Sequence, residues 1–359
     1  MTLIANLEGA TGYNGIDFVP IYPDGRVAGS DRFTPRNERI TDRMLDPSLI
    51  LENFQICKRI HAYISERCDR DNTVVISHEN SVAVGQTVAE MLGHPYVMAF
   101  TAPYFVMKMP INAETFNAES NILNRFRAEL NLPPVLDWGS WLRRPICKIG
   151  LWPEWFAPND PDWMFEVSPV GFVWNREIEI GEIPEEVKGL LADGDPPVLI
   201  THGTSEPENS KFFSTGVEAC AILGRNVILI TPYDDVAPNY TSARILRYKY
   251  LPFASLLPYM GTIIHHGGIG TLYQSMAAGI PQMALTYGYD RPDNGARIQR
   301  LGIGKSLPPF RWKPEIVAEA MRSLMTPDVQ TRCRDLSLRA TSMTEASSTV
   351  CDIIAPLLG

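Results

Sequence analysis

The residues best suited to chemistry in this sequence lie in a glycine-rich segment of its second half. A short apolar run over 262–265 is followed by the letters HGGIGT, and a helical pattern continues from 272 to 278. Glycines at a strand-to-helix turn let a ligand approach the backbone, and the free amides and positive dipole end of the helix attract phosphate oxygens. The segment therefore predicts an anion site.

Two interpretations of this anion site compete. Gly268 and Gly270, with Asp290 twenty residues beyond Gly270, imitate a dinucleotide-binding fingerprint. Tyr273 occupies the position of its third glycine, however, and a partial G-x-G is a weak signal. The second interpretation is a nucleotide-sugar site, and it depends on the spacing of residues further along the chain.

The segment over 262–304 resembles the donor-binding signature of the UDP-glycosyltransferase family, which is related to plant, sterol and antibiotic glycosyltransferases. In that family a histidine opens an H-x-G-x-x-[ST] loop. A polar residue follows eight positions after the histidine, and an acidic residue with a polar neighbour follows twenty-four positions after it. These positions are occupied here by His266, by Gln274, and by Asp290 with Arg291.

The resemblance implies a complete donor site. The implied donor-binding residues are Gly203, Thr204, Tyr250, Phe253, His266, Gly267, Gly268, Ile269, Gly270, Thr271, Gln274, Asp290 and Arg291. His266, the amides of the glycine turn and the Thr271 hydroxyl would hold the diphosphate, because all three kinds of group donate hydrogen bonds to phosphate. Asp290 would accept hydrogen bonds from sugar hydroxyls.

By the same resemblance, the nucleoside is bound outside that turn. The letters YLPF resemble the family's W-x-P-Q turn, so Tyr250 would stack on the base and the Phe253 backbone would read its edge. Gln274 would bind the ribose, although many members carry Glu at this position. Gly203 and Thr204 correspond to a second phosphate-binding pair, but a Gly-Thr pair at a strand end is more often an ordinary turn.

The elements that must position these residues are short apolar strands separated by helical patterns. Candidate strands cover Thr2–Asn6, Ile16–Ile21, Thr73–His78 and Tyr96–Phe100 in the first half, and Pro197–Thr201, Asn226–Thr231, Ile245–Tyr250, Thr262–His265 and Gln282–Thr286 in the second. This pattern indicates an α/β fold with parallel sheets covered on both faces. The resemblance implies the GT-B arrangement, in which two Rossmann-like domains face each other across a cleft.

Composition divides the chain into three expected parts. Residues 1–175 would form an acceptor-binding domain, and residues 197–359 the donor-binding domain. Between them, residues 176–196 are rich in Glu, Gly, Asp and Pro and predict a linker with one short helix over Glu185–Leu191. The last predicted helix, Thr344–Leu358, would cross back to the first domain, as the resemblance implies.

The catalytic base of the resembled family lies on a loop after the first strand. A predicted strand follows Met1 at once, so we expect the first βα unit of this domain, with its base, to be missing. His78 is the visible substitute, because it follows a predicted strand and an imidazole titrates near neutral pH. The alternative, which the sequence alone favours, is a structural histidine at a helix entry that bonds a loop carbonyl.

Aromatic residues crowd a proline-rich stretch of the first half. They are Trp138, Trp141, Trp152, Trp155, Phe156 and Trp163. One interpretation is a hydrophobic pocket for the acceptor, since aromatic rings supply large flat contact areas. The other is packing of an irregular region against the edge of the domain. Residue types alone do not separate the two.

Composition excludes several other classes of protein. The 359 residues carry a net charge of −9 with no basic cluster, which argues against a nucleic-acid partner. The six cysteines lie far apart and include no C-x-x-C pair, so neither a zinc site nor a disulfide framework is indicated. No apolar run is long enough to span a bilayer and no signal peptide is visible, so we expect a cytoplasmic protein whose membrane contact is at most peripheral.

The resemblance implies an inverting transfer of a hexose from a UDP-sugar, with UDP-glucose the expected donor, to a hydroxyl of a largely apolar small molecule. Arg291 stands where many members carry Gln, so the sugar stays open. Neither a metal nor a cofactor is expected, because His266 and the helix amides would stabilise the leaving diphosphate. Two alternatives are a catalytically silent subunit that binds sugar nucleotides and a GT-B-fold sugar-nucleotide epimerase. An epimerase would need no acceptor.

Overall fold

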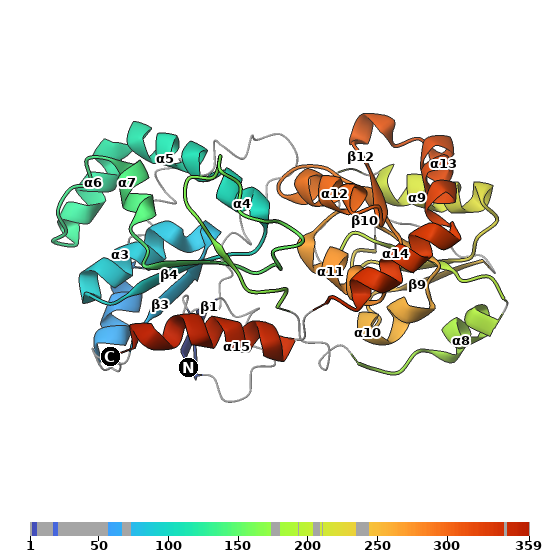
Figure 1. The fold of residues 1–359 in the computed structure, drawn as a ribbon, viewed down its shortest axis with the longest axis horizontal. Coiled ribbons are helices and arrows are strands. Elements are labelled where there is room, and N and C mark those ends of the chain that lie inside the picture. The colour runs from blue at the N-terminus through green and yellow to red at the C-terminus, as the bar shows by residue number, and fades with distance from the viewer. Residues whose placement is uncertain are drawn as a thin grey trace.

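The computed structural model describes residues 2–5, 17–20, 57–66, 73–173, 180–192, 194–203, 209, 211–234, 244–340 and 343–358. These residues form two α/β halves that lie side by side (Figure 1). Each half is built on a parallel sheet, as the alternation of apolar strands and helices predicts. The strand order places the division between the halves after β6 and before β7.

The first half contains a four-stranded sheet in the order β3-β4-β5-β6 and a separate parallel pair, β1-β2. Its strands are β1 (Thr2–Ala5), β2 (Asp17–Pro20), β3 (Val75–His78), β4 (Tyr96–Phe100), β5 (Cys147–Gly150) and β6 (Ser168–Pro169). Its helices cover residues 57–66, η4 (Glu79–Ser81), α3 (Val82–Leu92), α4 (Pro103–Met107), α5 (Met109–Ala118), α6 (Ser120–Glu129) and α7 (Trp138–Arg143).

The second half contains a six-stranded parallel sheet in the order β12-β11-β10-β7-β8-β9. Its strands are β7 (Val198–Thr201), β8 (Val227–Ile230), β9 (Ile245–Tyr248), β10 (Thr262–His265), β11 (Gln282–Leu285) and β12 (Gly304–Leu307). Its helical elements are α8 (Glu185–Ala192), α9 (Lys211–Ile222), α10 (Phe253–Leu256), η6 (Leu257–Tyr259), α11 (Ile269–Ala277), α12 (Arg291–Arg300), η7 (Pro309–Arg311), α13 (Pro314–Leu324) and α14 (Pro327–Ser337).

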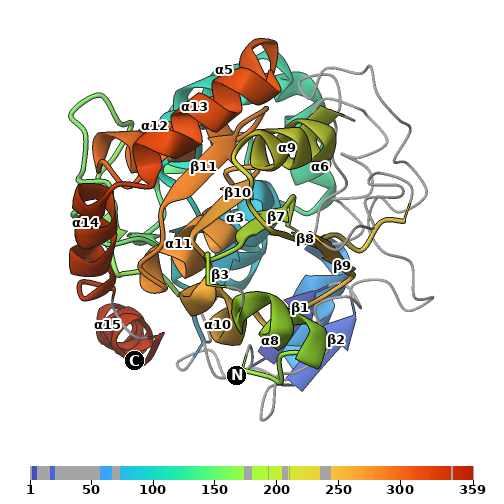
Figure 2. The same ribbon diagram turned by 90° about the vertical axis from the view of Figure 1, so that its right-hand side faces the viewer.

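Helices cover both faces of the second sheet (Figure 2). Val227 and Leu229 of β8 pack in one core with α9 and α13, whereas Ile228 and Ile230 pack in another core with α8 and α10. Successive side chains of a strand point to opposite faces, so a strand buried on both faces must be apolar throughout. Because α8 packs in this core, part of the predicted linker belongs by its contacts to the second half.

The first sheet is also covered on both faces, and one cover comes from the other end of the chain. Tyr96, Met98 and Phe100 of β4 face the aromatic core, whereas Val97 and Ala99 face the last helices, α15 (Met343–Ile354) and η8 (Ala355–Leu357). Figure 1 shows α15 lying along the first half, whereas α14, which precedes it in the chain, lies on the second. The predicted return of the final helix is confirmed.

The aromatic residues of the first half form its core. Trp138, Trp141, Trp152 and Phe156 are each at most 3% exposed, so these side chains pack inside the protein rather than lining a pocket. The same core continues across to the second half. Phe172 packs on Tyr273 of α11 with ring centroids 4.3 Å apart, and Arg297 of α12 donates to the Phe156 carbonyl at 3.4 Å. The aromatic region therefore joins the two halves.

Candidate donor-binding site

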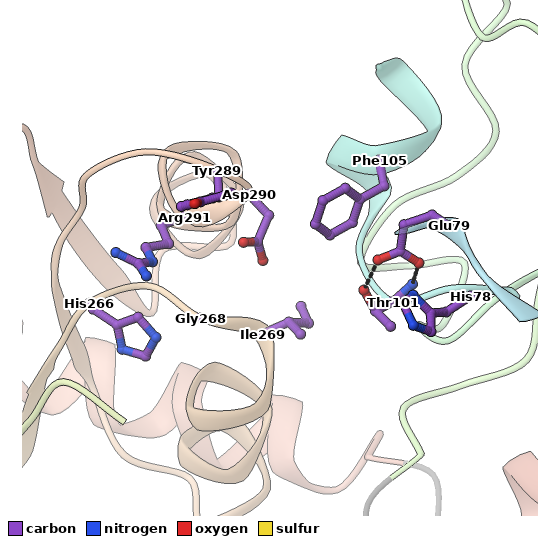
Figure 3. A pocket seen from close by; sticks show the side chains of 10 residues that line it. All are labelled: His78, Glu79, Thr101, Phe105, His266, Gly268, Ile269, Tyr289, Asp290 and Arg291. Carbon is purple, nitrogen blue, oxygen red and sulfur yellow. Dashed lines mark hydrogen bonds between the residues drawn. The ribbon is translucent and has the colours of Figure 1, made fainter. Parts of the chain in front are cut away.

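A pocket of about 410 Å³ lies between the two halves (Figure 3). The first half contributes His78, Glu79, Thr101 and Phe105, and the second contributes His266, Gly268, Ile269, Tyr289, Asp290 and Arg291. Most of these residues follow the carboxyl ends of strands β3, β4, β10 and β11. In open parallel sheets this edge is where ligands bind, because the strands end there and the loops leave the backbone accessible.

The wall of the pocket in the second half begins with the turn from β10 to α11. Gly267 has a φ of +93°, and a Cβ at this position would lie 2.9 Å from the Arg291 carbonyl oxygen. Gly268 is the N-cap of α11 and, having no side chain, cannot cap the first turn of the helix. The first amides of α11 are therefore left for a ligand, and their partial positive charge suits an anion.

His266 occupies a space that the neighbouring glycines leave open. A Cβ at Gly203 would lie 2.8 Å from His266 Cε1, and a Cβ at Gly268 would lie 2.3 Å from His266 Nε2. Burial is the main reason that the pKa of His266 lies well below its ordinary value, and His202, His265 and Arg291 lower it further. Without ligand, the His266 imidazole is therefore neutral at pH 7.

Asp290 lies at the turn from β11 to α12, opposite the first half. Asn294 Nδ2 donates to Asp290 Oδ2 at 2.6 Å and to the Gly267 carbonyl at 3.0 Å, which ties this turn to the glycine turn. Burial raises the pKa of Asp290, and the Glu79 carboxylate across the pocket raises it further. The backbone of the preceding Tyr289 is left-handed, with a φ of +53°, and this conformation directs the chain into α12.

Arg291 contributes the positive charge on this side of the pocket. Its Nη1 donates to the Tyr287 carbonyl at 3.2 Å, and its guanidinium lies over the Tyr289 ring. Figure 3 shows the Arg291 side chain on the same side of the pocket as His266, whereas the Asp290 carboxylate lies nearer the first half. The second half thus separates an anion-binding end of the pocket from an end suited to hydroxyl groups.

The opposite wall is built by residues that follow β3 and β4. These strands pair in parallel with His78 beside Ala99, so the residues after them meet at one edge. Thr101 donates to Glu79 through its amide at 3.0 Å and its hydroxyl at 2.6 Å, which fixes the buried carboxylate. The His78 side chain is exposed, and its Nε2 lies 3.2 Å from Ser81 Oγ.

The structure brings together only some of the residues predicted for the site. His78, His266, Gly268, Ile269, Asp290 and Arg291 line the pocket, whereas Gly203, Tyr250, Phe253, Gly267, Gly270, Thr271 and Gln274 are not among its lining residues. Thr204 lies outside the described residues. Tyr250 is 67% exposed just after β9, and Gln274 has a buried Oε1 without a hydrogen-bond partner in the described part of the chain.

The lining residues that the prediction omitted are Glu79, Thr101, Phe105 and Tyr289. Glu79 was visible beside His78 as a charged residue directly after an apolar strand. Thr101 and Phe105 carry no such signal, and only the pairing of β3 with β4 places them at the pocket.

Replacing Gly267 with alanine is expected to destabilise the protein by about 1–3 kcal/mol, because alanine adopts a φ of +93° only under strain and its Cβ would meet a backbone oxygen. Gly270→Ala is the matched control. Gly270 is helical and a Cβ there meets nothing within 4 Å, so this change should be neutral or slightly stabilising. Urea unfolding measures both free energies, and equal stabilities for the two variants would contradict the role of the turn.

Comparison with known proteins agrees with this architecture. Residues 234–354 match the family described as "Erythromycin biosynthesis protein CIII-like, C-terminal domain". The glycosyltransferase of kitacinnamycin has a similar structure, with a TM-score of 0.76 over 100% of this chain and 91% of that one at 18% identity. The calicheamicin glycosyltransferase CalG4 gives a TM-score of 0.71 at 17% identity, over 100% of this chain and 90% of that one. The two halves therefore form a GT-B fold.

Proteins related in sequence indicate which kind of glycosyltransferase the chain resembles. The O-mycaminosyltylonolide 6-deoxyallosyltransferase of Streptomyces fradiae is 29% identical over 60% of this chain. The matched region covers 51% of that relative, so this chain spans about half of its length. The vancomycin aglycone glucosyltransferase of Amycolatopsis orientalis is 24% identical over 89% of this chain and 81% of its own length. The chain is similar to antibiotic glycosyltransferases, the resemblance that its donor-binding signature predicted. No helix in the described ranges is long and apolar enough to cross a membrane.

Proposed function

We propose that this protein is a glycosyltransferase that moves a hexosyl group from a UDP-sugar, with UDP-glucose as the first candidate, to a hydroxyl group of a largely apolar small molecule. The observation that carries the proposal is the pocket between the halves, which combines His266 and the open amides of α11 with the carboxylate of Asp290. The natural-product relatives support the class of acceptor.

The proposed reaction is a single displacement at the anomeric carbon. The acceptor oxygen attacks from the side of the first half as the bond to the diphosphate breaks, so the anomeric configuration inverts. His266 and the amides of α11 would stabilise the negative charge that develops on the leaving diphosphate. Asp290 would hold the sugar through its hydroxyl groups, and His78 would accept the proton of the attacking hydroxyl.

The nucleotide is the part of the proposal that can be tested first. A ligand that binds only the folded protein raises its stability by about 2.7 kcal/mol at one hundred times its dissociation constant. We expect UDP and UDP-glucose to raise the melting temperature, and dTDP and dTDP-glucose form the comparison, since a solved relative, VinC, was determined in complex with dTDP. If no nucleotide raises the melting temperature, the proposed assignment of this pocket as the donor-binding site is wrong.

Turnover is then measured with the bound sugar nucleotide and a panel of phenolic, sterol and polyketide acceptors. We expect a glycosylated product and release of the nucleoside diphosphate only when acceptor is present. Formation of an epimeric sugar nucleotide without acceptor would contradict the proposed transfer, as would binding without any turnover across the panel.

Replacing Asp290 with alanine is expected to weaken binding of UDP-glucose by about 1–3 kcal/mol while leaving UDP affinity nearly unchanged, because its carboxylate would contact the sugar alone. The matched control is Asp293→Ala, since Asp293 lies in the first turn of α12, just after Asp290, but pairs with Arg297 at 2.7 Å. Calorimetry with both ligands measures the two affinities. Equal losses for UDP and UDP-glucose in the Asp290 variant would show that Asp290 does not contact the sugar.

A further inference from the structure

Two histidines occupy equivalent positions after neighbouring strands. In the pairing of β7 with β10, Thr201 lies beside His265, so the next residues, His202 and His266, leave the sheet side by side. Their rings stack with centroids 4.8 Å apart and an interplanar angle of 30°. His202 is only 4% exposed, and its ring packs edge-on against Phe212 at 4.9 Å. The register of the sheet therefore builds a fixed platform beneath His266.

His266 is held on several sides but keeps hydrogen-bonding capacity. The platform lies on one face of the ring, and a Cβ at Gly203 or Gly268 would collide with the ring. The Nδ1 atom of His266 is buried without a hydrogen-bond partner in the part of the chain that the structure describes. Because the side chain also lines the pocket, a ligand there meets an imidazole whose orientation is already set (Figure 3).

Some groups around His266 disfavour a proton on its ring, and others would favour one. His202, His265 and Arg291 disfavour a proton on His266, and His265 is itself neutral because burial lowers its pKa to about 4. Asp290 and Glu79, which would favour a proton, face the same pocket, as does the titratable His78. Burial and the neighbouring groups therefore favour the neutral imidazole in the absence of ligand.

We propose that binding of a nucleoside diphosphate sugar to this pocket takes up one proton on His266, and that His202 is the positioning residue that holds the receiving ring. The inference depends on the proposed function, since the diphosphate supplies the negative charge. That charge favours the imidazolium, and a charged imidazole forms stronger hydrogen bonds to phosphate than a neutral one. A second proton on the stacked ring is disfavoured, because two positive charges at this separation repel each other.

The coupling has a defined sign. Without ligand the pKa of His266 lies well below its ordinary value. The negative charge of a bound diphosphate would raise this pKa, so the complex would carry up to one more proton at a pH between the two values. Affinity must then fall as pH rises, by up to about tenfold per pH unit within that window. A site that binds the diphosphate without a proton would show a flat profile.

The test is calorimetry of UDP-glucose binding at pH 7.5 in buffers of different ionisation enthalpy, repeated with dTDP-glucose. Neither ligand carries a phosphate that titrates near neutral pH, so any proton taken up goes to the protein. The slope of the observed enthalpy against buffer enthalpy gives the number of protons, and we expect a net uptake of up to one proton. Tight binding with a slope of zero overturns the inference and leaves the proposed function intact, whereas no binding by either ligand overturns both.

Substitutions of His266 and His202 test which ring takes up the proton and whether the His202 ring positions His266. His266→Gln, which donates a hydrogen bond but does not titrate, should abolish the uptake. His202→Phe preserves a flat ring and should keep the uptake, whereas His202→Ala removes the ring and should lower the affinity severalfold more than the Phe variant. His94→Gln is the control remote from the pocket. Loss of the uptake in His202→Phe would place the proton on His202 and contradict the assignment, as would its persistence in His266→Gln.

Discussion

Replacing His78 with alanine is expected to slow glycosyl transfer by about 10²–10⁴-fold, which is the contribution of a well-placed general base. The residue lines the pocket from the first half, opposite the turn that carries Asp290. Its Nε2 already lies 3.2 Å from the Ser81 hydroxyl, and this contact helps to orient the ring. Affinity for UDP-glucose should change little, because the donor is held by the second half.

The measurement is kcat at saturating donor with whichever acceptor is turned over. His61→Ala is the matched control, since His61 lies on the helix over 57–66, where its ring contacts Ser65 at 3.4 Å, and it is not among the lining residues of the pocket. If turnover of the His78 variant equals that of wild type, the base is another group. Glu79, buried at the same wall, would be the next residue to replace.

Removing the His266 side chain is expected to weaken UDP binding by about 1.5–3 kcal/mol, roughly 10- to 150-fold, because a charge-assisted hydrogen bond to phosphate is lost. Thr271→Ala should weaken UDP binding in the same direction if its hydroxyl reaches a phosphate. Calorimetry with UDP measures both affinities, and a thermal melt checks that each variant is folded. If both variants bind UDP with wild-type affinity, the diphosphate does not bind at the glycine turn.

The glycine turn could be predicted because all of its signals are local. The histidine, the glycines and the helix that follows are consecutive in the chain, and Asp290 and Gln274 stand at fixed distances from His266. The other wall could not be predicted in the same way. Thr101 reaches the pocket because β3 and β4 pair in register, and a single sequence does not specify that pairing. The same limitation hid His202, whose place beside His266 depends on the register of β7 and β10.

Some strands could likewise be predicted from their own residues, whereas others could not. Central strands such as β7 and β8 are buried at every position because helices cover both faces, and their mostly apolar sequences predict them well. The strand β12 was missed because it lies at the edge of its sheet, where Lys305 and Ser306 interrupt the apolar pattern. The prediction also missed β5, whose letters CKIG are equally mixed, and the helices α4 to α7.

The return of α15 has a consequence for how the protein is made. Val97 and Ala99 leave the ribosome before the second half, but the residues that cover them, Val350, Ile353 and Ile354, emerge only after the strands of the second sheet. Until then the first sheet presents an apolar face to water, and such faces are where nascent chains aggregate or recruit chaperones. The amino-terminal half therefore completes its fold only after the carboxyl-terminal half has been synthesised, so the two halves cannot mature strictly in the order of translation.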